Sequence, residues 1–362
     1  DHYVADRGDV DPRARLLSDA GHWWHVARCC GLEPSHQPER VGFVSISKAD
    51  FEGMRLMARV LTLHYEDGHL QSRIAMELGL SPAKVNRLIK QGRESGMLKI
   101  SVDSPFQRGF ELEQNLTRQS NLKNCLVVSA EVGSSETTLS QVGKGAAKVL
   151  LENLKDGDTI CVSGGKGVSA VVEGLNPDRA YDVEVVPATG CVQDKFYTDV
   201  NHVAAQLAEK LGGRAWQIHA PLFAETPEQK EMLTEMRAVK EILERARNAT
   251  IAIVGVGSIL SDDSSYYDLH PTAKSDQSEI RHTGAVAELL AHLLDKKGNV
   301  CNYELNSRLV ALSPEDFSRV PLTMGVASGE NKIEPICSML RGNHLKSLVV
   351  DEQTAIGVLQ TL

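Results

Sequence analysis

The sequence predicts an α/β protein in which a winged helix-turn-helix domain precedes a larger domain built on a mostly parallel sheet. Two observations support this prediction. Short apolar runs alternate with amphipathic helical patterns over the last two thirds of the chain, as in parallel sheets with right-handed crossovers. A helix-turn-helix pattern lies near residue 80, and basic residues gather around it.

The composition is that of an ordinary soluble globular protein. The chain has 362 residues, 42% hydrophobic and 24% charged, so two or three domains are expected. No run approaches the roughly 18 consecutive apolar residues that a membrane helix needs, and no secretory signal pattern is present. The seven cysteines include no C-x-x-C, which favours a reduced, cytoplasmic protein over a disulfide scaffold.

Charge is distributed unevenly along the chain. The formal net charge of -9 argues against a protein that coats nucleic acid nonspecifically. Residues 69–100 nevertheless carry six lysines and arginines against two glutamates, a surplus of four positive charges. Because salt confines the reach of a charge to about 8–10 Å, a local basic face can act independently of the acidic remainder.

Residues 1–47 show no clear period and are expected to be a leader of unknown order. The cluster GHWWHVARCC in this segment contains residue types that bind metals. Its spacing matches none of the usual zinc patterns, so a loosely packed leader is preferred to the alternative of a metal site. The potential ligands there are His22, His25, Cys29 and Cys30.

Helical spacing starts near residue 50. Apolar residues recur at three- and four-residue steps over 51–61, and the sequence EDGH ends this helix. A second, short helix is expected over 72–78, followed by Gly79, which permits the positive φ of a sharp turn. Ser81 is suited to cap a third helix and Pro82 to begin it.

These segments form a helix-turn-helix pattern. Ala75 lets two helices cross closely, Gly79 makes the turn, and Val85 locks the second helix against the first. The second helix would enter a major groove with its amino-terminal end first. The strand-like segment 96–105 that follows predicts a winged variety. A helical hairpin with a solvated basic face is the alternative.

Outward-facing residues of these helices are the expected DNA contacts, with double-stranded operator DNA as the partner. Val85, Leu88 and Ile89 are expected to face inward, so the cations between them face base edges and phosphates. The candidate DNA-binding residues are Gln71, Ser72, Arg73, Ser81, Ala83, Lys84, Asn86, Arg87 and Lys90.

Strand-like and helix-like segments alternate after a helical connector at 106–124, which separates a helix-turn-helix domain (48–105) from a sheet domain (125–362). The expected strands are CLVVSA (125–130), TICVSG (159–164), YDVEVVPATG (181–190), RAWQIHAPLF (214–223), TIAIVGVGS (250–258), RLVAL (308–312), LTMGVAS (322–328) and SLVVD (347–351). The expected helices between them include TTLSQVGKGAAKVLLENL (137–154), VNHVAAQLAEKLG (200–212) and GAVAELLAHLLD (284–295).

Glycine-rich or polar segments follow several of these strands. In open α/β sheets, ligands bind beyond the carboxyl ends of the strands, at helix amino termini. SGGKG (163–167) combines three glycines with Lys166, and GVGS (255–258) and ASGENK (327–332) follow two further strands. The segment 189–201 supplies polar side chains suited to hydroxyl groups. Together they indicate a site for a small, polyhydroxylated ligand, which is anionic in one alternative.

No motif indicates a nucleotide site or catalysis. SGGKG lacks the first glycine of a nucleotide P-loop, and GVGSIL lacks the third glycine of the dinucleotide fingerprint. The sequence shows no Ser-His-Asp, metal-ligand or paired-carboxylate arrangement, so no catalytic residue, metal or cofactor is expected.

The order of the motifs resembles the SorC family (SorC/DeoR type) of sugar-binding bacterial transcriptional regulators. The resemblance runs from about residue 50 to 362 and includes VSGGKGVSAVVEGL, IAIVGVGS and VPLTMGVASGENKIEPICSMLRG. It implies that residues 125–362 form a Rossmann-like, sugar-phosphate-isomerase-like effector and oligomerisation domain. Such a domain would bind a sugar, polyol or sugar phosphate and form homodimers or homotetramers.

The resemblance also implies roles for particular residues. Lys332 matches a family lysine near the effector phosphate, and Asp199 and Asn201 match the polar start of a helix. The aromatic residue and the threonine of the family's S-W-G-x-T motif are replaced by Gly164 and Gly167. The candidate effector-binding residues are Ser163, Gly164, Gly165, Lys166, Gln193, Asp199, Asn201, Gly257, Ser258 and Lys332.

We therefore expect a cytoplasmic, ligand-responsive transcriptional regulator that is not an enzyme and has no membrane partner. Two alternatives stay open at this point. One is an active sugar-phosphate isomerase-like enzyme with an appended DNA-binding module, and the other is a constitutive DNA-binding protein with a degenerate pocket. The sequence leaves open whether the effector is phosphorylated.

Overall fold

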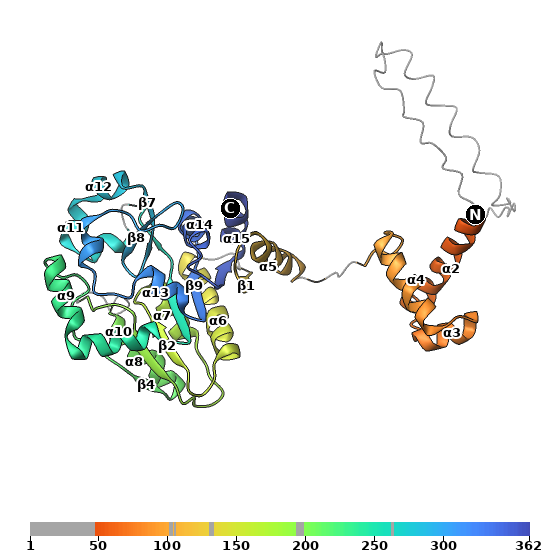
Figure 1. Ribbon diagram of the computed structural model, residues 1–362, viewed down its shortest axis with the longest axis horizontal. Coiled ribbons are helices and arrows are strands. Elements are labelled where there is room, and N and C mark those ends of the chain that lie inside the picture. The colour runs from red at the N-terminus through yellow and green to blue at the C-terminus, as the bar shows by residue number, and fades with distance from the viewer. Residues whose placement is uncertain (1–47, 101–103, 105, 130–133, 193–198, 262–263) are drawn as a thin grey trace, which may run out of the picture. The chain divides into compact units, whose positions relative to one another are not determined.

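The computed structural model describes residues 48–100, 104, 106–129, 134–192, 199–261 and 264–362 (Figure 1). The chain divides into two units, residues 1–101 and 102–362. The predicted leader at 1–47, with the four potential metal ligands in it, lies outside the described residues. Among the described residues, no helix combines the length and apolar character needed to cross a membrane.

The described part of the first unit is helical. Its buried core includes Val60, Ile74 and Val85. Gly79 ends the second helix with a left-handed φ of 64°, and the Ser81 side chain accepts a hydrogen bond from the third helix. The three predicted helices are thus confirmed as α2 (Lys48–Tyr65), α3 (Gln71–Leu78) and α4 (Pro82–Glu94).

The strand expected over 96–105 is wrong for the part that the structure describes. Residues 96–100 and 104 lie in turn or irregular conformation. The backbone N–H of Leu98 bonds to the Gly92 carbonyl at 3.0 Å, and the Leu98 side chain packs against the helical core. Leu98 therefore closes the end of α4 instead of pairing with a strand.

A seven-stranded parallel sheet organises the second unit, which confirms the predicted α/β class. The strand order is β1-β10-β9-β5-β2-β3-β4, so β1 and β4 are the edges. The strands are β1 (Asn124–Val128), β2 (Thr159–Val162), β3 (Glu184–Pro187), β4 (Arg214–Ala215), β5 (Ile251–Gly255), β9 (Leu322–Ala327) and β10 (Ser347–Asp351).

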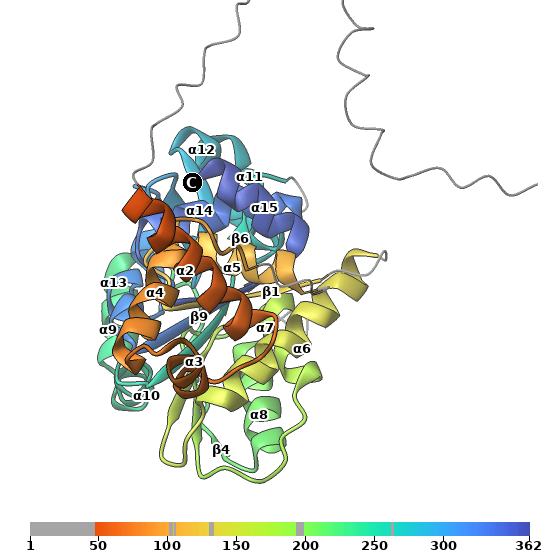
Figure 2. The same ribbon diagram turned by 90° about the vertical axis from the view of Figure 1, so that its right-hand side faces the viewer.

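Helices cover both faces of this sheet (Figure 2). One layer consists of α6 (Ser135–Asn153), α7 (Lys166–Gly174) and α8 (Val200–Leu211). The other includes α5 (Gln107–Gln119), α13 (Pro314–Arg319), α14 (Ile333–Arg341) and α15 (Glu352–Thr361). Between β4 and β5 the chain forms α9 (Pro227–Glu235) and α10 (Arg237–Arg247).

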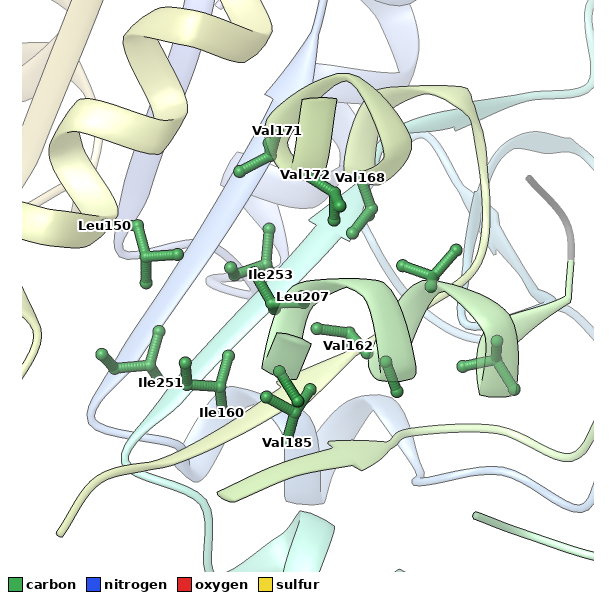
Figure 3. Packing of buried hydrophobic residues seen from close by; sticks show 14 of the residues in the cluster. Leu150, Ile160, Val162, Val168, Val171, Val172, Val185, Leu207, Ile251 and Ile253 are labelled. Atoms are coloured by element: carbon green, nitrogen blue, oxygen red, sulfur yellow. The ribbon is translucent and has the colours of Figure 1, made fainter. Parts of the chain in front are cut away.

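Two apolar cores result from this layering. Successive strand residues point to opposite faces, so Ile160 and Val162 join the core under α6–α8, whereas Cys161 joins the core on the other face. Figure 3 shows the first core, whose side chains include Leu207 of α8 and Ile253 of β5. Because both faces of the sheet are buried, its strands are continuous apolar runs, which made them recognisable in the sequence.

A smaller antiparallel sheet lies between β5 and β9 along the chain. It consists of β6 (Gly257–Ser258), β7 (Ala285–Leu289) and β8 (His292–Asp295), in that order. The short helices η2 (Ser265–Asp268), α11 (Pro271–Ser275), α12 (Gln277–His282) and η3 (Glu304–Arg308) accompany it.

The helix expected over 284–295 is wrong, because these residues form the β7–β8 hairpin. Leu290 and Ala291 at its tip have φ of 51° and 66°, as in a two-residue hairpin turn. Nearly every residue of the segment is buried, on both faces of the hairpin. The segment therefore lacks the alternation of apolar and polar residues that indicates a strand, and its apolar run fits a helix equally well.

Two expected strands are not formed as predicted. Only the first two residues of 214–223 belong to β4, and the segment 308–312 contains isolated bridges and no named strand. Beyond β4, the backbone N–H and carbonyl of Ile218 bond to the side-chain amide of Asn201 and not to a strand. The other six expected strands are confirmed, as are the helices over 137–154 and 200–212.

Candidate functional site

A cavity of about 620 Å³ lies at the carboxyl ends of the central strands β2, β5 and β9. The order in which strands are added to the sheet changes side here: β3 lies on one side of β2, whereas β9 lies on the opposite side of β5. Open α/β sheets bind ligands at such a switch point. The volume suits a small molecule, for which sites of roughly 300–1,000 Å³ are usual.

Most of the candidate effector residues meet in this cavity. Asp199 and Asn201 do not line it: Asp199 caps α8, and the Asn201 side chain holds the backbone of Ile218 through two bonds of 2.9 Å. Gln193 lies outside the described residues. The residues that line the cavity are Ser163, Gly164, Gly165, Lys166, Gly257, Ser258 and Lys332.

Glycines shape the cavity wall at the starts of two helices. Gly165 before α7 has φ of 118° and Gly329 before η4 (Glu330–Lys332) has φ of 104°, values that L side chains rarely adopt. The first N–H groups of a helix lack intrahelical partners, so the start of α7 can bind an anionic or hydroxyl group. A Cβ on Gly167 would lie 2.8 Å from the Val326 carbonyl oxygen, which leaves no space for the threonine expected from the resemblance.

Opposite charges lie together in the cavity. Burial lowers the pKa of the Lys332 amine; the Glu288 carboxylate opposes that shift, and the Lys166 amine adds to it. Burial raises the pKa of Glu288, while a hydrogen bond from the Ala291 backbone N–H and the charge of Lys332 oppose that shift. The absence of a side chain on Gly257 leaves the space that the Glu288 carboxylate occupies. The cavity can therefore bind both an anionic group and hydroxyl groups.

Sequence reasoning missed Glu288. The available signal is one acidic residue inside the otherwise apolar run AVAELLA, which also fits the helix expected over 284–295. Nine further polar residues that line the cavity were also absent from the candidate residues: Ser135, Glu136, Thr189, Ser261, Ser264, Ser265, Asp268, Ser328 and Asn331. No group of three His, Cys, Asp or Glu side chains in the described ranges is arranged to hold a metal ion.

The candidate DNA-binding residues lie on the surface of the first unit. Val85, Leu88 and Ile89 of α4 are buried at 5% exposure or less, as predicted, and the candidates around them are exposed except for Gln71, which is half-buried. The Ser81 hydroxyl accepts a hydrogen bond from the Lys84 backbone N–H and so holds the start of α4. The exposed cations thus lie on one side of α4, opposite its apolar side.

Comparisons with known proteins agree with this architecture. Residues 104–360 match the family described as "Putative sugar-binding domain". The chain is 29% identical over 312 residues to the transcriptional regulator LsrR of Escherichia coli K12, covering 84% of this chain and 94% of LsrR. It is 29% identical over 304 residues to the erythritol catabolism regulatory protein EryD of Brucella abortus, covering 83% and 95% respectively.

A solved structure shares the fold. The full-length sorbitol operon regulator SorC from Klebsiella pneumoniae has a TM-score of 0.67 with this chain at 24% identity, covering 85% of this chain and 99% of that one. The family match spans nearly the whole second unit, which contains the cavity. The chain belongs to the SorC family of sugar-binding transcriptional regulators.

Proposed function

We propose that the protein regulates transcription by binding operator DNA with an affinity that a sugar, polyol or sugar phosphate controls. The observation that carries this proposal is the cavity at the switch point of the sheet, where Lys166, Lys332 and Glu288 meet glycine-rich strand ends. The printed names of the relatives support the class of ligand, since EryD concerns erythritol and SorC concerns sorbitol. Both compounds are polyols.

The DNA-reading element in this proposal is the helix-turn-helix of α3 and α4. The amino-terminal half of α4 would enter the major groove, with Arg87 and Asn86 toward base edges and Lys84 and Lys90 toward phosphates. Two copies of the chain would place two such helices about 34–36 Å apart, on successive turns of DNA. A homodimer or homotetramer is therefore part of the proposal.

The effector would bind through two kinds of contact. Hydroxyl groups can donate hydrogen bonds to the Glu288 carboxylate, and an anionic group can lie near the amines of Lys166 and Lys332 and the start of α7. An allosteric coupling of about 1–3 kcal/mol would change operator affinity about 5- to 150-fold.

A gel shift on the DNA upstream of the gene tests the proposal. The full chain is combined with that DNA and with erythritol, sorbitol, D-ribose 5-phosphate or D-glucosamine 6-phosphate. We expect one compound to change operator affinity by about fivefold or more. Lys332→Met should abolish this change, whereas Lys297→Met, at an exposed lysine, should preserve it.

Two other results would contradict the proposal. DNA binding that no sugar, polyol or sugar phosphate alters, together with an unchanged melting temperature, would indicate a constitutive DNA-binding protein; a ligand at 100 times its Kd should stabilise the chain by about 2.7 kcal/mol. Turnover of a phosphosugar that Lys332→Met abolishes would indicate an enzyme.

A further inference from the structure

Helix α5 covers the edge of the parallel sheet. Strand β1 is an edge strand, and α5 lies against it with α15 beside it (Figure 2). Along the chain, α5 is the first element of the second unit, and the short segment 101–106 joins it to the unit that contains α4. Helix α5 is therefore the element of the second unit that lies nearest along the chain to the DNA-binding unit.

Helix α5 is held to the sheet by a small apolar contact. Leu116 is its one fully buried side chain, and Leu112 is half-buried against the same core. Phe106 at its start and Phe110 one turn later are 63% and 53% exposed. Helices with few buried apolar contacts belong to the less stable parts of a protein.

Two polar contacts supplement this small apolar contact. The Glu113 carboxylate accepts a hydrogen bond of 2.9 Å from the backbone N–H of Val127 in β1. An edge strand normally leaves such N–H groups without a partner in the sheet, and here a side chain replaces the missing strand. The Arg108 guanidinium also lies 2.7 Å from the carboxylate of Glu352 at the start of α15.

Both contacts lie next to Asp351, whose carboxylate binds the backbone of Gly329 in the cavity wall. Val128, next to Val127, pairs in register with Asp351, which immediately precedes Glu352. The Asp351 carboxylate is 4% exposed and accepts hydrogen bonds from the Gly329 backbone N–H at 3.1 Å and from the Thr354 hydroxyl at 2.6 Å. Gly329 lines the cavity, and its N–H also bonds to the Thr354 oxygen at 2.9 Å.

We propose that Asp351 couples the Gly329 wall of the cavity to the docking of α5, through Val127 and Glu113 on one path and Glu352 and Arg108 on the other. This inference rests on the proposed function: an effector that displaces the Gly329 turn would change how firmly α5 is held, and α5 would pass that change to the DNA-binding unit. The two states of the switch are α5 docked on β1 and α5 released. Glu113 and Arg108 are positioning residues in this account and do not touch the effector.

Amide hydrogen exchange of the full chain, without DNA or effector, tests this coupling. Glu113→Ala should speed exchange in α5 and also, by about fivefold or more, in the cavity segment 328–332, because coupling between two sites is reciprocal. Thr354→Val, which loosens the hold on Gly329, should likewise speed exchange in α5. Helix α8 serves as the internal reference and should be unchanged if the rest of the fold is intact.

Two control variants separate coupling from a general loss of stability. Glu113→Gln keeps an acceptor for the Val127 N–H, so it should leave exchange in segment 328–332 within about twofold of the wild type. Arg118→Ala, on the exposed side of the same helix, should do so as well.

Faster exchange in α5 of Glu113→Ala, with segment 328–332 unaffected, would overturn the inference. Equal acceleration in Glu113→Gln would overturn it too. Because the experiment contains neither operator nor sugar, its failure is distinguishable from failure of the proposed function, which the gel shift tests.

Discussion

The two units place the same chemical group, a lysine amine, in opposite environments. The Lys90 side chain on α4 of the first unit is 75% exposed. Lys332 in the second unit lies in the cavity, where burial lowers the pKa of its amine and the Glu288 carboxylate opposes that shift. Exposed cations attract phosphates of any sequence at little cost in folding, whereas desolvated charges need a matching partner. The first arrangement suits a long polyanion, and the second suits selection of one small molecule.

If this contrast holds, the buried ionisable groups of the second unit should make folding depend on pH. Burial lowers the pKa of His292 to about 4, and the charge of Lys230 adds to this shift. The stabilisation from a neutral His292 is complete above pH 6.5 and is lost as the pH falls toward 4, by about 3 kcal/mol in total. In urea unfolding at pH 7 and pH 4.5, His292→Gln should lose less stability on acidification than the wild type.

The exposed His219 provides the matched control for this experiment. His219→Gln should keep the pH dependence of the wild type. An identical loss of stability in all three proteins would show that His292 does not remain neutral in the folded protein at pH 4.5.

A smaller effect is expected when the cavity loses one partner of its charge pair. Glu288→Ala removes the carboxylate that opposes the desolvation of Lys332, and it leaves the Ala291 N–H without its acceptor. The free energy of unfolding should fall by about 1–3 kcal/mol. Glu330→Ala, at an exposed glutamate of η4 that does not line the cavity, should change it by less than about 0.5 kcal/mol. Equal losses in urea unfolding would contradict the contrast between buried and exposed charges.

In the first unit, the largest expected effect is on DNA binding, without an effect on folding. Arg87→Ala should weaken the specific operator complex by about 1–3 kcal/mol if the guanidinium contacts a guanine. Fluorescence anisotropy with the operator and with a scrambled duplex measures this difference. A loss of the same size on both duplexes would assign Arg87 to the phosphates instead.

Lys90→Ala should give the smallest effect, and one without sequence preference. Affinity for both duplexes should fall equally, and the slope of log affinity against log salt should decrease by about 1. Folding stability should change by less than about 0.5 kcal/mol, since the 3.7 Å ion pair with Glu94 is exposed. A loss confined to the operator would place Lys90 at the bases.

The sequence predicted elements whose signals are local. Gly79 marks the end of α3, and Ser81 and Pro82 mark the start of α4. These signals lie within a few residues of each other, and the expected helices are confirmed. The doubly covered sheet was likewise recognisable, because burial on both faces produces unbroken apolar strands. Lys166 at the end of β2 followed from the general rule for open sheets, whereas Lys332 followed from the resemblance to the SorC family.

Features that depend on distant partners were not predictable. Glu288 can be recognised as a cavity residue only from its position beside Lys332 and Gly257, and both lie far from it along the chain. Asn201 looked like a ligand for hydroxyl groups, but its amide is used by the backbone of Ile218. The same burial that revealed the central strands concealed the β7–β8 hairpin, since its apolar run shows no alternation.

The hairpin tip places two side chains in the cavity wall at backbone angles that favour asparagine and glycine. Leu290 and Ala291 both have positive φ and both line the cavity. Left-handed angles cost such residues roughly 1–2 kcal/mol each. An Asn-Gly tip should therefore yield a more heat-resistant protein with a roomier cavity.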